Sequence, residues 1–115
     1  MRKWVIYTQN FIVSKDLISE LVKKSSITKD YLVYEIGAGE GAITNELLKK
    51  AKKVVAFEID TNLFNKLSQR FKNEKSLKLR LGDFLSFSLP KQPYKVFSNI
   101  PFNITSSIVK KLTET

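Results

Sequence analysis

The sequence predicts an α/β fold built on a doubly wound, mainly parallel sheet. The hydrophobic pattern alternates along the whole chain between the two-residue period of strands and the 3.6-residue period of helices. A glycine-rich turn joins one apolar strand to the helix after it. The connections are short, which favours right-handed crossovers between neighbouring parallel strands. Such a sheet binds its ligand at the carboxyl ends of the strands.

The first half of the chain predicts one helix and then a strand–turn–helix unit. Leucine, isoleucine and valine side chains share one face over 16–25, which indicates an amphipathic helix. The apolar run 32–36 indicates a buried strand, and the glycines of 37–41 allow a tight turn. Helical spacing of apolar residues returns over 42–50 and completes the unit.

The second half predicts another unit of the same kind and two further strands. Residues 54–58 form a short apolar strand, and a helix follows from about 63 to 71. Leucines alternate with basic residues over 77–81, which indicates a third strand. Residues 94–98 predict a fourth strand, and a last helix begins after it. The whole pattern is Rossmann-like.

The composition favours a nucleic-acid partner and excludes several kinds of chemistry. Twenty Lys and Arg residues against eleven Asp and Glu give the 115-residue chain a net charge of +9, which favours a polyanion, although solubility alone can also explain a basic surface. The chain has no Cys and no His, so disulfides, thiol nucleophiles and histidine acid–base catalysis are excluded. We expect no metal, and chemistry that depends on a cofactor, amides or carboxylates.

We expect no targeting segment in this sequence. The apolar run near the N-terminus is too short for a signal peptide, and no run approaches the ~18 apolar residues of a membrane span. We therefore expect a cytoplasmic protein with no membrane partner, and separately we expect a monomer.

Four predicted strand ends carry residues suited to a cofactor site. The segment 35–41, Glu58, Asp83 and Asn99 should converge on one crevice. Gly37 in that segment allows close approach of the backbone to a ligand. Glu58 follows Gly37 at about the spacing at which an acidic residue meets ribose hydroxyls.

The charges around the turn distinguish between two cofactors. The pattern Gly37-x-Gly39-x-x-Ala42 also fits the loose fingerprint of nicotinamide and flavin dinucleotides. Glu35 and Glu40, however, would place like charge against a pyrophosphate. S-adenosylmethionine carries an ammonium and a sulfonium and no phosphate, so these carboxylates favour it.

The remaining strand ends predict recognition of adenine rings. Asp83 can accept a hydrogen bond from the adenine amino group of the cofactor, and Phe84 can pack against that ring. The Asn99 amide and a carbonyl held by Pro101 can accept hydrogen bonds from the amine of a target base, on which Phe102 can stack. This arrangement would direct the amine lone pair toward a methyl group.

Five segments, in order, resemble the motifs of the rRNA adenine N6-dimethyltransferases, and more closely those of the erythromycin-resistance (Erm-type) branch. The segments are Gln9-Asn10-Phe11, 34–41, Glu58-Ile59-Asp60, Gly82-Asp83-Phe84 and 98–105. The resemblance implies a cofactor site made of Gln9, Asn10, Phe11, Glu35, Gly37, Ala38, Gly39, Glu58, Ile59, Asp83, Phe84 and Asn99. It implies a catalytic motif made of Asn99, Ile100, Pro101 and Phe102.

The resemblance implies S-adenosylmethionine-dependent methylation of an adenine N6 amine in protein-free 23S rRNA. The outcome would be resistance to macrolides, lincosamides and streptogramin B. Phe102 replaces the commoner tyrosine, which keeps the stacking surface and removes a hydroxyl. Three alternatives stay open: the housekeeping branch that dimethylates small-subunit 16S rRNA, a DNA or protein methyltransferase, and a non-catalytic RNA-binding remnant.

Members of this family continue beyond the point where the present sequence stops. They add further strands and a C-terminal helical domain that helps to hold RNA, so residues 1–115 are expected to form a truncated N-terminal domain. The fourth strand or its neighbour should then expose an edge and apolar surface. The lysines at 49, 50, 52 and 53, and the segment 2–4, are either contacts to RNA phosphates or solvated surface.

Overall fold

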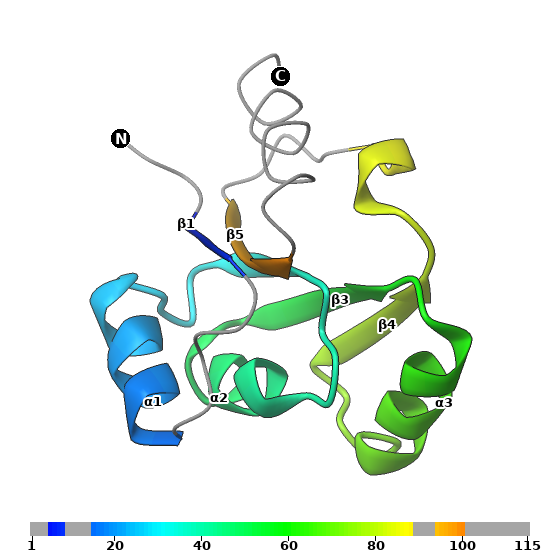
Figure 1. The fold of residues 1–115 in the computed structure, drawn as a ribbon. Coiled ribbons are helices and arrows are strands. Elements are labelled where there is room, and N and C mark those ends of the chain that lie inside the picture. Colours follow the sequence, from blue (N-terminus) through cyan, green and yellow to red (C-terminus); the bar gives the residue numbers. More distant parts are fainter. Residues whose placement is uncertain (1–4, 9–14, 89–93, 101–115) are drawn as a thin grey trace.

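The chain forms a five-stranded parallel sheet with helices packed on one face (Figure 1). The structure, a computed structural model, describes residues 5–8, 15–88 and 94–100. The strands are β1 (Val5–Thr8), β2 (Leu32–Ile36), β3 (Lys53–Glu58), β4 (Leu77–Leu81) and β5 (Tyr94–Ile100). The helices are α1 (Lys15–Lys24), α2 (Ala42–Lys50) and α3 (Thr61–Arg70), with a 3₁₀ turn η1 at Phe84–Ser86.

The strand order is β1-β5-β2-β3-β4, and every pair is parallel. From β2 the chain moves outward through β3 to β4, and it then returns to the other side of β2 as β5. This reversal between β2 and β5 is the topological switch point of a doubly wound sheet. The predicted fold class is confirmed, and the switch point marks where a ligand should bind.

The three helices cover the same face of the sheet, as Figure 1 shows. Every second residue of the strands points toward them, and the core there contains Val33, Val54 and Phe97 from the strands. Leu47 of α2 and Leu67 of α3 pack against this set and are almost completely buried. Burial of apolar surface at roughly 25 cal/mol per Å² holds the helices on the sheet.

The opposite face of the sheet is an aromatic layer. Its rings lie 5.1 to 6.2 Å apart between centroids, mostly edge to face, the geometry that aromatic quadrupoles favour. The layer consists of Tyr34, Phe57, Phe84, Phe87 and Tyr94. Because this layer covers one face and the helices cover the other, β2 is buried along its whole length.

Most predicted elements agree with the structure to within one or two residues. The helix predicted from about 63 begins at Thr61, because the Asp60 side chain accepts hydrogen bonds from the amides of Asn62 and Leu63 and so caps it. The strand predicted at 94–98 extends to Ile100. The helix predicted after this strand lies outside the described residues.

The sheet edge beside the fourth predicted strand is formed by its neighbour β1, in agreement with the expectation that the fourth strand or its neighbour lies at an edge. β1 was not predicted, and it pairs with β5 along the register Val5↔Phe97 to Thr8↔Ile100. The backbone groups of β5 on this side are therefore paired with another strand. Among the helices of the described part of the chain, none has the length and apolar character needed to cross a membrane.

Candidate functional site at the carboxyl ends of the strands

The glycine-rich turn after β2 is held against the end of β3. The amides of Gly37 and Ala38 donate to the Phe57 carbonyl at 3.0 and 3.2 Å. Gly37 and Gly39 have φ angles of 75° and 57°, in the left-handed region that glycine adopts without the steric cost of a Cβ. The turn therefore reverses sharply while its backbone stays close to β3.

Glu58, the last residue of β3, bridges the turn and the start of α3. Its Oε1 accepts a hydrogen bond from the Gly39 amide at 2.8 Å, and its Oε2 accepts one from the Asp60 amide at 3.0 Å. A carboxylate has about four lone-pair sites, so Glu58 keeps the capacity to accept hydrogen bonds from hydroxyl groups. The next residue, Ile59, is 70% exposed and offers an apolar surface at the same edge.

Glu35 lies under the turn with its carboxyl group completely buried. The Thr44 hydroxyl of α2 donates to Glu35 Oε1, whereas Oε2 has no hydrogen-bond partner among the described residues. Burial raises the pKa of Glu35 to about 8, with a further contribution from the negative charge of Glu58, against the lowering effect of the Thr44 hydrogen bond. Glu35 is therefore mostly protonated at neutral pH in this structure.

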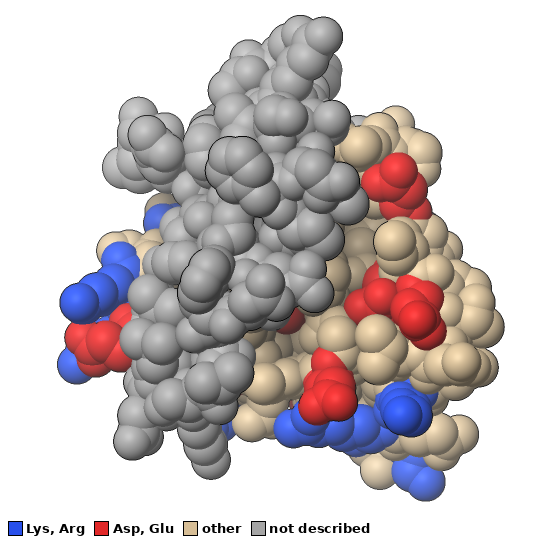
Figure 2. Space-filling view, in the orientation of Figure 1, with Lys and Arg blue, Asp and Glu red and all other residues tan. Residues whose placement is uncertain are grey.

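This protonation corrects the charge argument made from the sequence. Glu35 was expected to carry a full negative charge beside the turn, but the sequence does not reveal that its carboxyl group is buried with no cationic partner among the described residues. The negative charge at this edge comes instead from the exposed side chains of Glu40, Asp60 and Asp83 together with Glu58. Figure 2 shows acidic side chains gathered over the part of the molecule where β3 and β4 end.

One basic residue also contacts the turn. The Arg70 guanidinium at the end of α3 donates to the Glu40 carbonyl at 2.6 Å and lies 5.0 Å from the centre of the Phe71 ring. Sequence reasoning missed Arg70 and Thr44, because each acts through a contact between distant residues. The only local signal is their position on helices that flank the turn.

Asp83 follows β4 and reaches the same edge. The backbone amide of the preceding residue, Gly82, donates a hydrogen bond to the Glu58 carbonyl at 3.0 Å. This bond joins the ends of β3 and β4. Asp83 Oδ1 accepts from the Leu85 amide at 2.9 Å and so caps η1. The exposed carboxylate still has lone pairs available for an adenine amino group.

Phe84 differs from its predicted position. Its ring is 1% exposed and packs in the aromatic layer against Tyr34 and Phe57. The ring therefore does not form an open surface for an adenine, since η1 turns it into the core. Phe84 supports the segment that carries Asp83.

The predicted catalytic segment begins at the end of β5. Asn99 and Ile100 are the last residues of that strand and pair in register with Tyr7 and Thr8. Their neighbour in the sheet is β2, where Ile36 pairs with Ser98 directly before the glycine-rich turn. The backbone thus brings Asn99 beside the turn, as predicted. The other members of the predicted site, Gln9, Asn10, Phe11, Pro101 and Phe102, lie outside the described residues.

Gly41 provides a test of how tightly the turn is packed. Its φ is +92°, and a Cβ built there would lie 2.7 Å from Cε2 of Phe71. We expect Gly41→Ala to lower the free energy of unfolding by about 2 to 4 kcal/mol, the sum of backbone strain and overpacking. Urea unfolding measures this. Gly39→Ala is the control, because its φ is +57° and its nearest neighbour lies at 3.9 Å; equal losses for both variants would contradict the packing argument.

Comparison with known proteins places these features in a family context. The profile described as "Ribosomal RNA adenine dimethylase" matches residues 2–115. An rRNA adenine N-6-methyltransferase of Escherichia coli is 37% identical over 113 residues, which cover 97% of this chain and 46% of that protein. The Ribosomal RNA small subunit methyltransferase A of Caldanaerobacter subterraneus is 37% identical over 121 residues, covering 98% and 44%.

A solved structure is also similar to this chain. The crystal structure of the 23S rRNA methyltransferase ErmE superimposes with a TM-score of 0.82 at 31% sequence identity, covering 89% of this chain and 42% of that one. The chain spans about half the length of the curated relatives that it matches.

Proposed function

We propose, since the chain belongs to the ribosomal RNA adenine dimethylase family, that it transfers methyl groups from S-adenosylmethionine to the N6 amine of an adenine in 23S rRNA. The observation that carries this proposal is the position of Glu58. Its carboxylate closes the glycine-rich turn through Gly39 and lies at the carboxyl end of β3, next to β2, which borders the switch point. This is the place at which a sheet of this topology binds a nucleoside.

The described residues fit S-adenosylmethionine better than a dinucleotide. Glu58 would accept hydrogen bonds from the ribose hydroxyls, Asp83 would accept one from the adenine amino group, and Ile59 would pack against the adenine. Several carboxylates and one arginine surround the turn, a balance that favours a cationic ligand over a pyrophosphate. When bound, S-adenosylmethionine would supply an electrophilic methyl group.

We assign the catalytic role to residues 99–102. The Asn99 amide oxygen and the carbonyl before Pro101 would accept hydrogen bonds from the two hydrogens of the target N6 amine. These bonds localise the nitrogen lone pair and point it toward the methyl group, while Phe102 stacks on the base. Gln9, Asn10 and Phe11 would hold the methionine end of the cofactor, and Thr8, which precedes them, ends β1 opposite Ile100.

The choice of 23S rRNA over 16S rRNA is supported by the likeness to ErmE, a 23S rRNA methyltransferase. A specific observation also favours a second candidate, since the small-subunit methyltransferase A of Caldanaerobacter subterraneus is as identical to the chain as the Escherichia coli relative is. If 23S rRNA is the substrate, methylation would confer resistance to macrolides, lincosamides and streptogramin B.

Transfer of labelled methyl groups from S-adenosylmethionine to protein-free 23S and 16S rRNA tests the proposal. The modified base is mapped by primer extension. We expect label on one adenine of 23S rRNA. Label on 16S rRNA alone would assign the chain to the housekeeping branch, and absence of label from both RNAs would contradict methyl transfer by this chain.

Glu58→Gln should weaken cofactor binding. The substituted amide can accept only one of the hydrogen bonds from Gly39 and Asp60 and loses the negative charge that orients ribose hydroxyls. We expect the affinity for S-adenosylmethionine, measured by titration calorimetry, to fall by roughly 10- to 100-fold, the value of a charge-assisted hydrogen bond. Glu74→Gln removes the same charge from an exposed turn and should bind like the wild-type chain. Unchanged affinity in Glu58→Gln would remove Glu58 from the cofactor site.

A further inference from the structure

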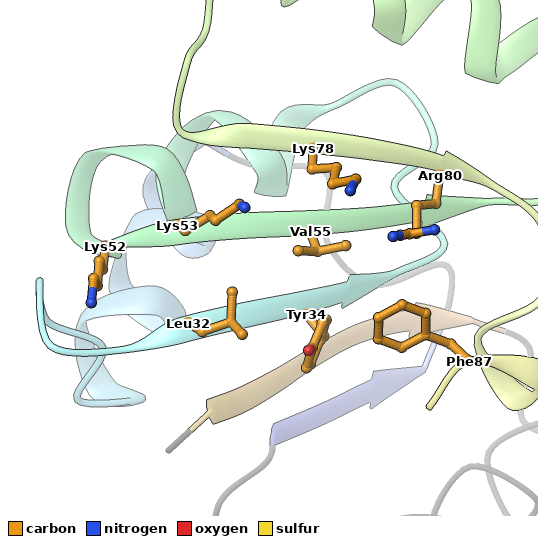
Figure 3. Close-up of a pocket in the computed structure, with 8 residues that line it drawn as sticks. All are labelled: Leu32, Tyr34, Lys52, Lys53, Val55, Lys78, Arg80 and Phe87. Atoms are coloured by element: carbon orange, nitrogen blue, oxygen red, sulfur yellow. The ribbon is translucent and has the colours of Figure 1, made fainter. Parts of the chain in front are cut away.

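A basic hollow opens on the aromatic face of the sheet, the face without α1, α2 and α3 (Figure 3). Its volume is about 250 Å³. Four cations and four uncharged residues of the described chain line it, namely Lys52, Lys53, Lys78, Arg80, Leu32, Tyr34, Val55 and Phe87. The described lining thus contains no acidic side chain, and the hollow is strongly positive.

The alternation of the strands places these cations together. Along β4 the leucines face α3, so Lys78 and Arg80 between them face the aromatic layer. Lys78 pairs in register with Val55 of β3, and Lys53 lies two residues earlier on the same face. In Figure 3 the charged ends of Lys53, Lys78 and Arg80 lie along the same stretch of β3 and β4, whereas Lys52 points away from it.

These cations lack acidic partners in the described part of the chain. The ion pairs found there join Lys24 to Glu20 and Lys49 to Glu46. The Arg80 guanidinium lies 5.0 Å from the centre of the Phe87 ring, and its buried Nε has no described hydrogen-bond partner. Like charges gathered without counter-charges repel one another. An anion that binds among them relieves this repulsion, and the relief favours its binding.

We propose that this hollow binds the phosphate backbone of the RNA substrate, at a place separate from the cofactor edge. The inference rests on the proposed function, because that function supplies the RNA. An extended polyanion suits the site better than a small anion does, since the cations are spread along two neighbouring strands, β3 and β4. Arg80 precedes Asp83 by three residues, roughly 10 Å along a strand, so the hollow lies close to the cofactor edge, and one RNA molecule can reach both.

The salt dependence of RNA binding tests the proposal directly. The 115-residue chain is titrated against a labelled single-stranded RNA by fluorescence anisotropy at several salt concentrations. We expect the double variant Lys53→Gln/Lys78→Gln to reduce the magnitude of the negative slope of log K against log salt by roughly 1.4. Each lost phosphate contact removes about 0.7 from that magnitude. At about 0.1 M salt the affinity should fall roughly twentyfold.

Two further variants make the result specific to the hollow. Lys66→Gln/Lys72→Gln removes the same charge from exposed positions in and after α3 and should leave the slope unchanged. Lys53→Arg/Lys78→Arg keeps the charge and should bind like the wild-type chain. Calorimetry with S-adenosylmethionine should give the same affinity for all variants, which excludes a loss of fold as the cause.

The outcomes separate this inference from the proposed function. The hollow is not a phosphate site if Lys53→Gln/Lys78→Gln and Lys66→Gln/Lys72→Gln weaken RNA binding equally, or if the wild-type chain binds no RNA. The proposed function fails instead when the wild-type chain transfers no methyl group to RNA, whatever the salt dependence of binding.

Discussion

Asn99→Ala is expected to reduce the rate of methyl transfer to RNA by roughly 10²- to 10³-fold, the effect of removing one preorganised hydrogen-bonding group from a transition state. The backbone supports this expectation, because β5 carries Asn99 to the same edge as the glycine-rich turn of β2. The amide oxygen would bind the target amine more strongly as the nitrogen becomes positive. Removing it should therefore lower turnover far more than it lowers the affinity for S-adenosylmethionine.

Single-turnover methylation assays and calorimetry measure these two quantities separately. Asn65→Ala is the matched control, since Asn65 is exposed on α3 and should keep full activity. An Asn99→Ala chain with full turnover would exclude the catalytic role, and equal losses in turnover and cofactor affinity would reduce Asn99 to a cofactor ligand.

The stability of the chain should fall as the pH rises from about 5 to 8, because of Glu35. Its pKa is raised from 4.5 to about 8 by burial, so over this range the folded chain holds a proton that the unfolded chain releases. The free energy of unfolding decreases with pH wherever the folded state binds more protons. The loss is on the order of 1.4 kcal/mol per pH unit at most, and it ends above the raised pKa.

Glu35→Gln should abolish this pH dependence. The glutamine stays neutral at every pH, and its carbonyl oxygen can accept the Thr44 hydroxyl as Glu35 does. We expect the variant to match the wild-type chain near pH 5 and to exceed its stability by several kcal/mol at pH 9. Urea unfolding at a series of pH values gives both curves, with Glu74→Gln as the control. Parallel curves for Glu35→Gln and the wild-type chain would show that Glu35 titrates normally.

Much of the fold could be predicted because period and turn chemistry are local properties. The buried run 32–36 and the leucine alternation over 77–81 each identify a strand without knowledge of its neighbours. β1 could not be predicted this way. Its four residues, followed by polar residues, carry too little periodicity, and their pairing with β5 depends on contacts across about ninety residues of sequence.

The candidate site was predictable in its location and less so in its electrostatics. The spacing from Gly37 to Glu58 indicates a shared edge, and the structure brings the two residues together. The protonation of Glu35 depends on complete burial, and the orientation of the Phe84 ring depends on η1. Neither depth of burial nor ring orientation is set by neighbouring residues in the sequence. The protonation of Glu35 and the orientation of the Phe84 ring therefore could not be predicted from the sequence.

The central position of β2 has a consequence for molecular recognition. Asn99 lies at the end of the strand on one side of β2, and Glu58 ends the strand on the other. Strands in a sheet lie about 4.8 Å apart, so the backbones that carry these two residues are separated by two strand spacings, roughly 10 Å. Under the proposed function, the hydrogen-bonded sheet rather than a loop would therefore set the distance between the cofactor ribose and the base that is modified.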